Sequence, residues 1–304
     1  DGTTIDITTD QGDYQTQNLI VASGIQNVPT TPAAADKVPA NVTSMTTADY
    51  KNPAQLPEGA VMVVGSAQSG AQITEELLEA GRTVYLSTSK VGRFRRHIRG
   101  KDGLEWVIGA GMMKQTPADL ENPAAQHATQ PLASGVGGGR TISLQSIAAK
   151  GANLIGRVED FENTTAIIKD DLRENIDFAD GFSAHVIEML NPAIDKMAPG
   201  TPPLEDEPAD DPAPTDLGAN TPTRLDLDEA GITSIIWTTG FTGDYSWLNI
   251  EGHSMEHGRP VQTNGASPAK GVYYLGSPWL RTRASGIIYG ADTDAQAITQ
   301  QINA

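Results

Sequence analysis

The feature that most constrains this chain is a continuous apolar run at residues 60–64, followed directly by a turn with glycine at both ends. The turn consists of Gly65, Ser66, Ala67, Gln68, Ser69 and Gly70. An amphipathic segment with Ile73 and Leu77 on its apolar face comes next, then Gly81 and a second apolar run at residues 83–87. A strand, a glycine turn, a helix and a strand within about 30 residues are typical of a βαβ nucleotide-binding unit.

Each part of this turn has a physical reason in such a unit. Gly65 would let the chain reverse sharply after the strand, and Gly70 would let the helix pack closely on the sheet. The helix would then point its N-terminal N–H groups at a pyrophosphate, where the helix dipole favours negative charge. Ala67 stands where the usual pattern has a middle glycine, so the approach of the backbone to a phosphate is less free there. The alternative is a tight turn that binds no ligand.

The end of the second strand indicates which nucleotide the unit would bind. An NAD site usually has an acidic residue there, which holds the ribose 2′-hydroxyl. This chain instead has Ser87, Thr88, Ser89 and Lys90. Nearby cations follow at Arg93, Arg95 and Arg96. Hydroxyls and cations suit a 2′-phosphate, so we predict NADPH rather than NADH, with a solvated basic loop that pairs with acidic surface elsewhere as the alternative.

Composition excludes several classes of function. Acidic residues outnumber basic ones by 38 to 21, and the net charge of −17 argues against a nucleic-acid or anionic-membrane surface, because phosphates attract clustered lysine and arginine. The 304 residues include no cysteine, which excludes thiolate nucleophiles, disulfides and zinc–cysteine sites. We find no apolar run of about 18 residues and no signal-peptide pattern. We therefore expect a cytoplasmic protein with no membrane span that acts on a small molecule.

The remaining elements follow from hydrophobic periodicity. Residues 171–197 should form a long helix with Phe178, Phe182, Val186 and Leu190 on one face. Residues 199–222 are rich in proline and acidic side chains, so we expect a solvated acidic loop there. The other expected elements are a hairpin at 4–17, strands at 19–22, 154–161, 165–169, 232–237 and 271–276, and helices at 143–150 and 294–302.

Several motifs, in order along the chain, carry a family resemblance. Ala22, Ser23 and Gly24 follow a short strand and precede prolines, and Thr239 and Gly240 follow a second strand. Both stretches are similar to the links between the domains of two-dinucleotide flavoproteins. With the glycine turn and the C-terminal stretch 271–295, they make the chain resemble flavin-containing monooxygenases, in particular a bacterial flavoprotein branch. The resemblance covers nearly the whole chain apart from 199–222.

The resemblance implies an α/β fold with two dinucleotide-binding domains, Rossmann-like and three-layered, and the cofactors FAD and NADPH. Residues 1–32 and 223–304 would form the remainder of the FAD-binding domain, and residues 33–198 the NADPH-binding domain. The family's first element, a strand with its own G-x-G-x-x-G, has no counterpart here. We therefore expect the chain to lack the N-terminal FAD-binding segment, either as a truncated sequence or as a split or decayed gene.

The resemblance also implies individual site residues. Ala22, Ser23, Gly24, Thr239 and Gly240 would lie at the cofactor links. Arg283 would offer a cation to a cofactor phosphate or a developing anion, with a plain structural role as the alternative. Asp292 and Asp294 would cap the last helix, whose start the resemblance places near the flavin. No catalytic acid or base is assigned. No metal site is assigned either, because His253 and His257 are more simply interpreted as two loop residues that bind no metal.

The leading functional hypothesis is a monooxygenase-like enzyme in which NADPH passes hydride to FAD and the reduced flavin then reacts with oxygen. Thr46 stands where the family commonly has a histidine that belongs to its oxygenation fingerprint. A flavin reductase or dehydrogenase that never oxygenates is therefore one alternative. A second alternative is a non-catalytic remnant of such an enzyme, which would bind NADP but carry out no reaction.

Overall fold

The computed structural model describes residues 4–304, which form two compact units that we treat separately. Within these residues, unit 1 comprises 4–28, Gly111–Ala128 and Phe241–Ala304, and unit 2 comprises Pro29–Ala110 and Thr129–Gly240. These compact units differ in extent from the expected domains: residues 111–128 lie in unit 1, residues 223–240 lie in unit 2, and residues 29–32 also lie in unit 2. The second difference has a plain cause: the strand at 232–237 is an inner strand of the unit 2 sheet.

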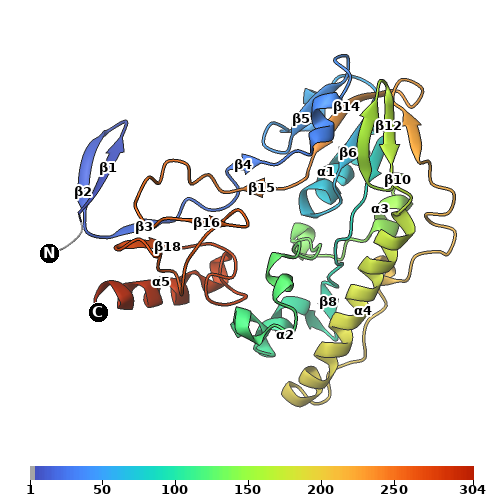
Figure 1. The fold of residues 1–304 in the computed structure, drawn as a ribbon. Coiled ribbons are helices and arrows are strands. Elements are labelled where there is room, and N and C mark those ends of the chain that lie inside the picture. Colours follow the sequence, from blue (N-terminus) through green and yellow to red (C-terminus); the bar gives the residue numbers. More distant parts are fainter. Residues whose placement is uncertain (1–3) are drawn as a thin grey trace. The chain divides into compact units, whose positions relative to one another are not determined.

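Unit 2 is built on a five-stranded sheet whose strands follow the order β10–β7–β6–β14–β5 and run parallel (Figure 1). The strands are β5 (Thr43–Thr46), β6 (Ala60–Val64), β7 (Val84–Ser87), β10 (Asn153–Ile155) and β14 (Ile232–Trp237). The predicted βαβ unit is confirmed, since β6 leads through α1 (Gln68–Glu79) to the parallel neighbour β7.

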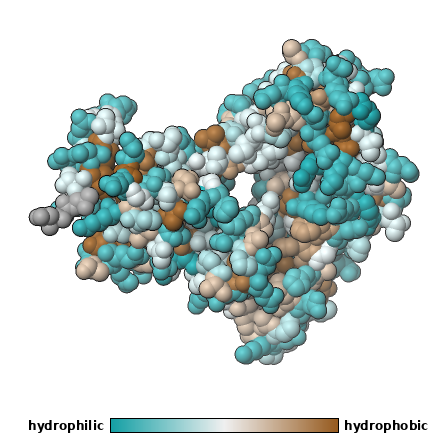
Figure 2. Space-filling model, viewed as in Figure 1, coloured by the Kyte–Doolittle hydropathy of each residue, from teal (hydrophilic) through white to brown (hydrophobic). Residues whose placement is uncertain are grey.

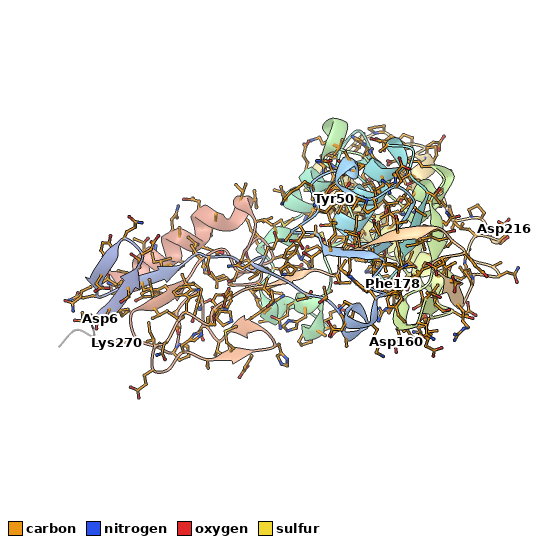
Figure 3. The ribbon with its side chains drawn as sticks, turned by 90° about the horizontal axis from the view of Figure 1, so that it is seen from above. Asp6, Tyr50, Asp160, Phe178, Asp216 and Lys270 are labelled. Atoms are coloured by element: carbon orange, nitrogen blue, oxygen red, sulfur yellow. The ribbon has the colours of Figure 1, made fainter. Side chains whose placement is uncertain are left out.

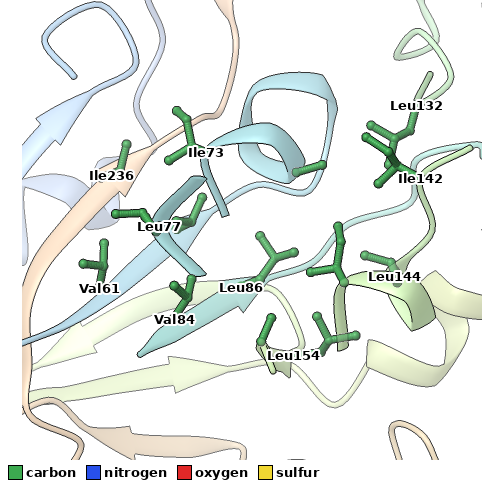
Figure 4. Close-up of a cluster of buried hydrophobic side chains, with 14 of the residues drawn as sticks. Val61, Ile73, Leu77, Val84, Leu86, Leu132, Ile142, Leu144, Leu154 and Ile236 are labelled. Atoms are coloured by element: carbon green, nitrogen blue, oxygen red, sulfur yellow. The ribbon is translucent and has the colours of Figure 1, made fainter. Parts of the chain in front are cut away.

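Strand β6 is buried on both faces, which explains its unbroken apolar sequence. Val61 and Val63 face a cluster that includes Leu77 of α1 and Leu86 of β7 (Figure 4). Met62 and Val64 face a second cluster on the other side of the sheet. The apolar run therefore marks the centre of the unit.

Helices cover the first face of the sheet. They are α1, α3 (Leu144–Ala149) and α4 (Leu172–Met197), and all three contribute side chains to the same cluster as Val61. Helix α4 confirms the predicted long helix, but its buried face runs through Ile176, Ala179 and Leu190. Phe178, labelled in Figure 3, is 43% exposed, so its assignment to the buried face was wrong. A strict four-residue spacing drifts off a face that repeats every 3.6 residues.

An antiparallel sheet of β11 (Val158–Glu162), β12 (Thr165–Ile168) and β13 (Arg224–Asp226) packs against the second face. The single strand expected at 154–161 is in fact two strands, β10 and β11, which belong to different sheets. They separate at Gly156, where an added Cβ would lie 1.9 Å from the carbonyl oxygen of Lys169. The result is the three-layered α/β arrangement that was expected.

Unit 1 has its own core, which includes Ile5, Val21, Tyr274 and Ile298. The predicted hairpin is present as β1 (Ile5–Thr9) and β2 (Gly12–Thr16), and β3 (Leu19–Val21) pairs in parallel with β18 (Val272–Tyr274). The other strands are β4 (Val28–Pro29) with β15 (Phe241–Thr242), and β16 (Met255–Glu256) with β17 (Arg259–Pro260).

The last helix, α5 (Ile288–Ile302), begins six residues before the expected start at 294. The remaining short elements are α2 (Gly103–Gly109), β8 (His97–Ile98), β9 (Lys101–Asp102), η1 (Ala33–Lys37), η2 (Pro53–Gln55), η3 (Met112–Lys114), η4 (Pro117–Asp119), η5 (Pro123–His127), η6 (Val136–Gly138) and η7 (Pro208–Asp210).

Hydrophilic side chains predominate on the face shown in Figure 2, with hydrophobic side chains scattered among them. Within residues 4–304, no helix has the length and apolar character needed to cross a membrane.

Candidate functional site

The carboxyl ends of the parallel strands of unit 2 meet at one edge of the sheet. The register places Val64 of β6 beside Ser87 of β7 on one side and beside Trp237 of β14 on the other, and Trp237 also pairs with Thr46 of β5. From β6 the chain proceeds through α1 to β7, whereas β14 lies on the opposite side of β6. Parallel α/β sheets bind ligands at such a switch point, outside the carboxyl ends of the strands.

The glycines of the turn are required by close backbone approach. Gly65 has a φ of +110°, a conformation that residues with a Cβ rarely adopt. A Cβ on Gly70 would lie 1.8 Å from the carbonyl oxygen of Gly65 and 2.7 Å from Oγ1 of Thr238. Thr238 also holds the turn from β14, because its hydroxyl lies 2.9 Å from the carbonyl oxygens of Val64 and Gly65.

The first turn of α1 is open to an acceptor. Ala67 is the N-cap residue, and no side chain of residues 4–304 caps the helix; its first turn carries no acidic residue either. Since the first N–H groups of a helix have no partner within it, they and the helix dipole form a ready site for an anion. Ala67 adopts φ −75° and ψ −167°, so its backbone does not need glycine.

Two polar residues of the turn hold neighbouring segments. Ser66 is buried, and its hydroxyl accepts a hydrogen bond of 3.0 Å from the N–H of Ser89. Gln68 accepts one of 3.1 Å at Oε1 from the N–H of Ala133. Ser69 is half-buried on the open first turn of α1. The structure therefore gives Ser66 and Gln68 positioning roles beside the open helix end.

Two of the hydroxyls predicted to bind a 2′-phosphate are instead buried, so that part of the prediction was wrong. Ser87 and Thr88 are each 1% exposed, and their hydroxyls donate to the carbonyl oxygens of Gly156 and Ile155. Thr88 also accepts a hydrogen bond from Asn175. Both side chains are thus used inside the fold, where they join the end of β7 to β10.

Ser89 and Lys90 remain as the residues at the end of β7 that a ligand can reach. Ser89 is half-buried. The Nζ atom of Lys90 lies 2.5 Å from Oε1 of Glu174 on α4, in a pair whose side chains are 49% and 57% exposed. Solvent screens such an exposed pair and makes it weak, so an anionic ligand can compete with Glu174 for the lysine.

The arginines predicted to bind a 2′-phosphate are instead paired with carboxylates of the protein. The side chains of Arg93 and Arg95 are only 3% and 5% exposed. Nη1 of Arg93 lies 3.0 Å from Asp180 of α4, and Nη1 of Arg95 lies 3.0 Å from Asp210. Arg96 is less buried and lies 2.6 Å from Asp102. The alternative, a basic loop that pairs with acidic residues elsewhere, describes these contacts, although the loop is buried rather than solvated.

The acidic partners come largely from residues 199–222, which we call the acidic segment. The expectation of a solvated loop was wrong for its middle part. Asp210 also accepts a hydrogen bond of 2.5 Å from the hydroxyl of Ser183 on α4, and Glu207 accepts one of 3.1 Å from the N–H of Thr141. Buried arginines need buried carboxylates, because an unpaired charge inside a protein is costly.

Glu205 extends this contact to the backbone of the basic loop. It accepts a hydrogen bond of 2.7 Å from the N–H of Arg99 and a second bond from the N–H of Gly100. Burial alone would raise the pKa of Glu205, but these backbone bonds and the charge of Arg95 hold it below its usual range. The acidic segment is thus bound along the basic loop from Glu205 to Asp210.

Tyr50, labelled in Figure 3, is a buried residue near the start of unit 2 that was not among the predicted site residues. Its hydroxyl donates a hydrogen bond of 2.9 Å to Glu76 of α1. Burial, followed by this hydrogen bond, raises the pKa of Tyr50 well above its ordinary value. The contact ties the segment after β5 to the helix that carries the candidate site.

Each of the two links named by the resemblance contains a glycine with a positive φ. In unit 1, Gly24 has a φ of +78°, and its carbonyl oxygen accepts a hydrogen bond of 3.2 Å from Tyr245, while Ala22 and Ser23 are exposed. In unit 2, Gly240 has a φ of +96° and accepts a hydrogen bond of 2.9 Å from the N–H of Thr30. Thr239 bonds to Thr30 through both its hydroxyl and its carbonyl oxygen.

Asp292 does not cap the last helix. It lies inside α5, is exposed, and accepts a hydrogen bond of 2.8 Å from Gln296; the N-cap residue of the helix is Ile287. Asp294 is likewise inside the helix, where its carboxylate lies 3.7 Å from Arg281. Arg283 lies in unit 1 with its guanidinium over Trp279. Within residues 4–304, no group of three or more histidine and acidic side chains is placed to hold a metal ion.

The sequence of this chain is similar to those of known oxidoreductases. Residues 1–108 match the family model described as pyridine nucleotide-disulphide oxidoreductase. A curated relative, an uncharacterized CzcO-like oxidoreductase from Geobacillus kaustophilus, is 29% identical over 302 residues, covering 97% of this chain and 67% of the relative. The chain resembles the flavin-containing monooxygenase-like oxidoreductases. The resemblance expected from the motifs is therefore confirmed.

Solved structures show the flavoprotein fold. A variant of a flavin monooxygenase from Stenotrophomonas maltophilia superposes with a TM-score of 0.56 at 15% identity, covering 98% of this chain and 66% of that one. A bacillithiol disulfide reductase from Staphylococcus aureus gives 0.50 at 13% identity, covering 98% and 66%. The chain thus spans about two thirds of the length of these proteins.

Proposed function

We propose that this chain forms the NADPH-binding part of a flavoprotein oxidoreductase of the monooxygenase-like kind, which acts on a small-molecule substrate. The observation that carries the proposal is the uncapped start of α1, which lies between the ends of β6 and β14 and is reached through the Gly65 turn. The free N–H groups there would hold the pyrophosphate. The residues present fit this group, because the turn needs glycine at Gly65 and Gly70 and leaves the helix end without a competing side chain.

A 2′-phosphate would be held at the end of β7. No acidic residue stands between Ser87 and Lys90 to accept a ribose 2′-hydroxyl, and among the described residues the lysine is paired only with the exposed Glu174. NADPH would displace that carboxylate from the ammonium. In this proposal Lys90 and Ser89 take the role first assigned to Arg93, Arg95 and Arg96.

FAD, when bound, would supply the acceptor for hydride and the centre that reduces oxygen. The chain itself would contribute binding and orientation. The absence of cysteine means that this chain supplies no redox-active disulfide, unlike an enzyme that reduces substrates through a dithiol. Monooxygenase-like chemistry therefore agrees better with the sequence than dithiol chemistry does.

One observation favours a second candidate, a flavin reductase that does not oxygenate. Thr46 stands where the resembled family commonly has a histidine, and its hydroxyl donates a hydrogen bond of 2.7 Å to Asp49. Bonds from the hydroxyl and the N–H of Thr46 lower the pKa of Asp49, so this carboxylate stays ionised at neutral pH. The stretch is thus a turn in which the polar groups of Thr46 bond to Asp49. Measuring product against NADPH consumed would separate the two candidates.

Substitution of Ala67 tests the nucleotide site without removing a contact. Ala67→Asp would cap α1 in the extended backbone conformation already present and stabilise the helix by about 1 kcal/mol. Its carboxylate would also occupy the place of the pyrophosphate. We expect the dissociation constant for NADPH to rise at least about tenfold while the melting temperature is unchanged or higher. Equal affinity in the variant and the parent chain would contradict the proposal, and Ala67→Ser serves as the uncharged control.

A further inference from the structure

Two arginines of unit 1 lie close together in sequence but differ in their counter-charges. Arg281 lies 3.7 Å from the carboxylate of Asp294 and donates to the carbonyl oxygen of Thr293. Arg283 has no carboxylate within 4.0 Å among the described residues, yet it is half-buried. Arg82 and Arg259 are also half-buried and lack a carboxylate, but their guanidinium groups donate to carbonyl oxygens through a terminal nitrogen, whereas no such partner of the terminal nitrogens of Arg283 is present among the described residues.

The side chain of Arg283 is held in place. Its Nε–H donates a hydrogen bond of 3.1 Å to the side-chain oxygen of Gln115, and its backbone N–H donates one of 2.8 Å to the carbonyl oxygen of the same residue. The guanidinium carbon lies 4.9 Å from the centre of the Trp279 ring. These contacts use one of the five side-chain N–H donors, and the two terminal nitrogens have no hydrogen-bond partner within residues 4–304.

The loop that carries Arg283 is rigid. Trp279 is buried and has a φ of +57°, a conformation in which a bulky residue is strained. The hydroxyl of Ser285 accepts hydrogen bonds of 3.1 Å from the N–H groups of Arg281 and Thr282. An added Cβ on Gly286 would lie 2.8 Å from the nitrogen of Pro278, so the loop closes tightly on itself. Strain held in this way is found at functional sites.

We infer that Arg283, positioned by Trp279 and Gln115, is a binding site for the carboxylate of a small molecule. A planar guanidinium whose two terminal nitrogens are free matches a carboxylate in bidentate geometry. One uncompensated cation balances the single negative charge of a carboxylate, whereas it leaves one charge of a phosphate dianion unpaired, because Arg281 is already paired with Asp294. Burial lowers the pKa of Arg283, in keeping with a cation that lacks a counter-charge.

This site goes beyond the proposed dinucleotide site. Its residues all belong to unit 1, whereas the open start of α1 and Lys90 belong to unit 2. Binding at Arg283 requires neither NADPH nor a flavin. The two proposals can therefore fail independently.

The test is a titration of the purified chain with sodium benzoate, followed by tryptophan fluorescence at constant ionic strength. We expect saturable binding to the parent chain, weakened at least about tenfold in Arg283→Gln. Arg283→Lys keeps the charge but loses the fork, so weaker binding than in the parent chain is expected there too. Arg259→Gln is the matched control, because Arg259 lies in the same unit, is half-buried and donates to a carbonyl oxygen at 3.4 Å.

A second titration uses inorganic phosphate as the probe. We expect phosphate to bind at least about tenfold more weakly than benzoate. The inference is overturned by phosphate binding as tightly as benzoate, by the absence of saturable binding, or by equal binding in Arg283→Gln and the parent chain. Circular dichroism of each variant shows whether it is folded. If Arg283→Gln does not fold, benzoate binding is compared between Arg283→Lys and Arg259→Gln. Weaker binding in Arg283→Lys supports the inference, and equal binding overturns it.

Discussion

The glycine turn at residues 65–70 and the basic loop at residues 92–100 lie in the same unit, and both carried the nucleotide prediction. The turn has the structure that its sequence predicts, with Gly65 at a positive φ and Gly70 against its carbonyl oxygen. The basic loop does not, because Arg93 and Arg95 point at Asp180 and Asp210 rather than outward. A backbone motif is determined by its own few residues, whereas the partner of a charged side chain can come from anywhere in the chain.

The acidic segment explains the difference. Asp210 follows Arg95 by 115 residues, and no local sequence pattern predicts that the two side chains are in contact. Long-range pairing of this kind turns a cluster that resembles a phosphate site into part of the interior. A charge cluster in a sequence is therefore weaker evidence for a ligand than a glycine pattern between a strand and a helix.

The largest expected effect comes from removing the acidic partner. Asp210→Ala would leave Arg93 and Arg95 with buried, partly unpaired charge, and we expect the free energy of unfolding to fall by about 3–5 kcal/mol. Urea unfolding measures this change. Asp216→Ala, in the same segment and exposed (Figure 3), should change it by less than about 0.5 kcal/mol. Equal effects of the two substitutions would show that the acidic segment is only a solvated loop.

The glycine turn should not tolerate substitution of Gly70, and the reason is steric rather than electrostatic. Gly70→Ala places a Cβ 1.8 Å from the carbonyl oxygen of Gly65, and we expect it to cost about 1–3 kcal/mol and to weaken NADPH binding. Gly181→Ala on α4 has open space around its added methyl group and should stabilise the chain by about 0.5–1 kcal/mol. A harmless Gly70→Ala would break the argument that the turn requires glycine.

Glu75 on α1 gives a pH-dependent test of the helix that carries the site. Burial would raise the pKa of Glu75, but its bonds to Arg140 and Lys150 outweigh burial and lower it from 4.5. Because the folded pKa lies below the unfolded one, these contacts stabilise the fold above about pH 4.5 and are lost as the pH falls through the folded value. The gap in unfolding free energy between the parent chain and Glu75→Gln, about 2 kcal/mol at pH 7, should shrink toward pH 3. A gap independent of pH would contradict the ion pairs.

The sequence was sufficient for elements with strong local signals. The run at β6, the helix α1 and the strand β14 lie where apolar continuity and periodicity placed them. Boundaries set by distant contacts were missed. Gly156 separates β10 from β11 because it packs against Lys169, and the start of α5 precedes Asp292 although no capping side chain marks it.

In the candidate site too, features determined by local sequence were predicted, and those determined by distant contacts were not. Gly65, Gly70 and the open helix start at Ala67 could be predicted, since the motif itself places them. The buried roles of Ser87 and Thr88 could not, because their partners Gly156 and Ile155 lie on β10 and in the turn after it. Tyr50 was missed for a similar reason, since its partner is Glu76 on α1.

The most direct test of the account compares the dissociation constants of NADPH and NADH for Lys90→Gln and Arg96→Gln. We predict that Lys90→Gln weakens NADPH binding about tenfold and leaves NADH binding unchanged, because the lysine would hold only the 2′-phosphate. Arg96→Gln should leave both constants within about twofold, because Arg96 is paired with Asp102. The reverse result, with NADPH binding lost in Arg96→Gln and kept in Lys90→Gln, would return the phosphate site to the basic loop and contradict the account.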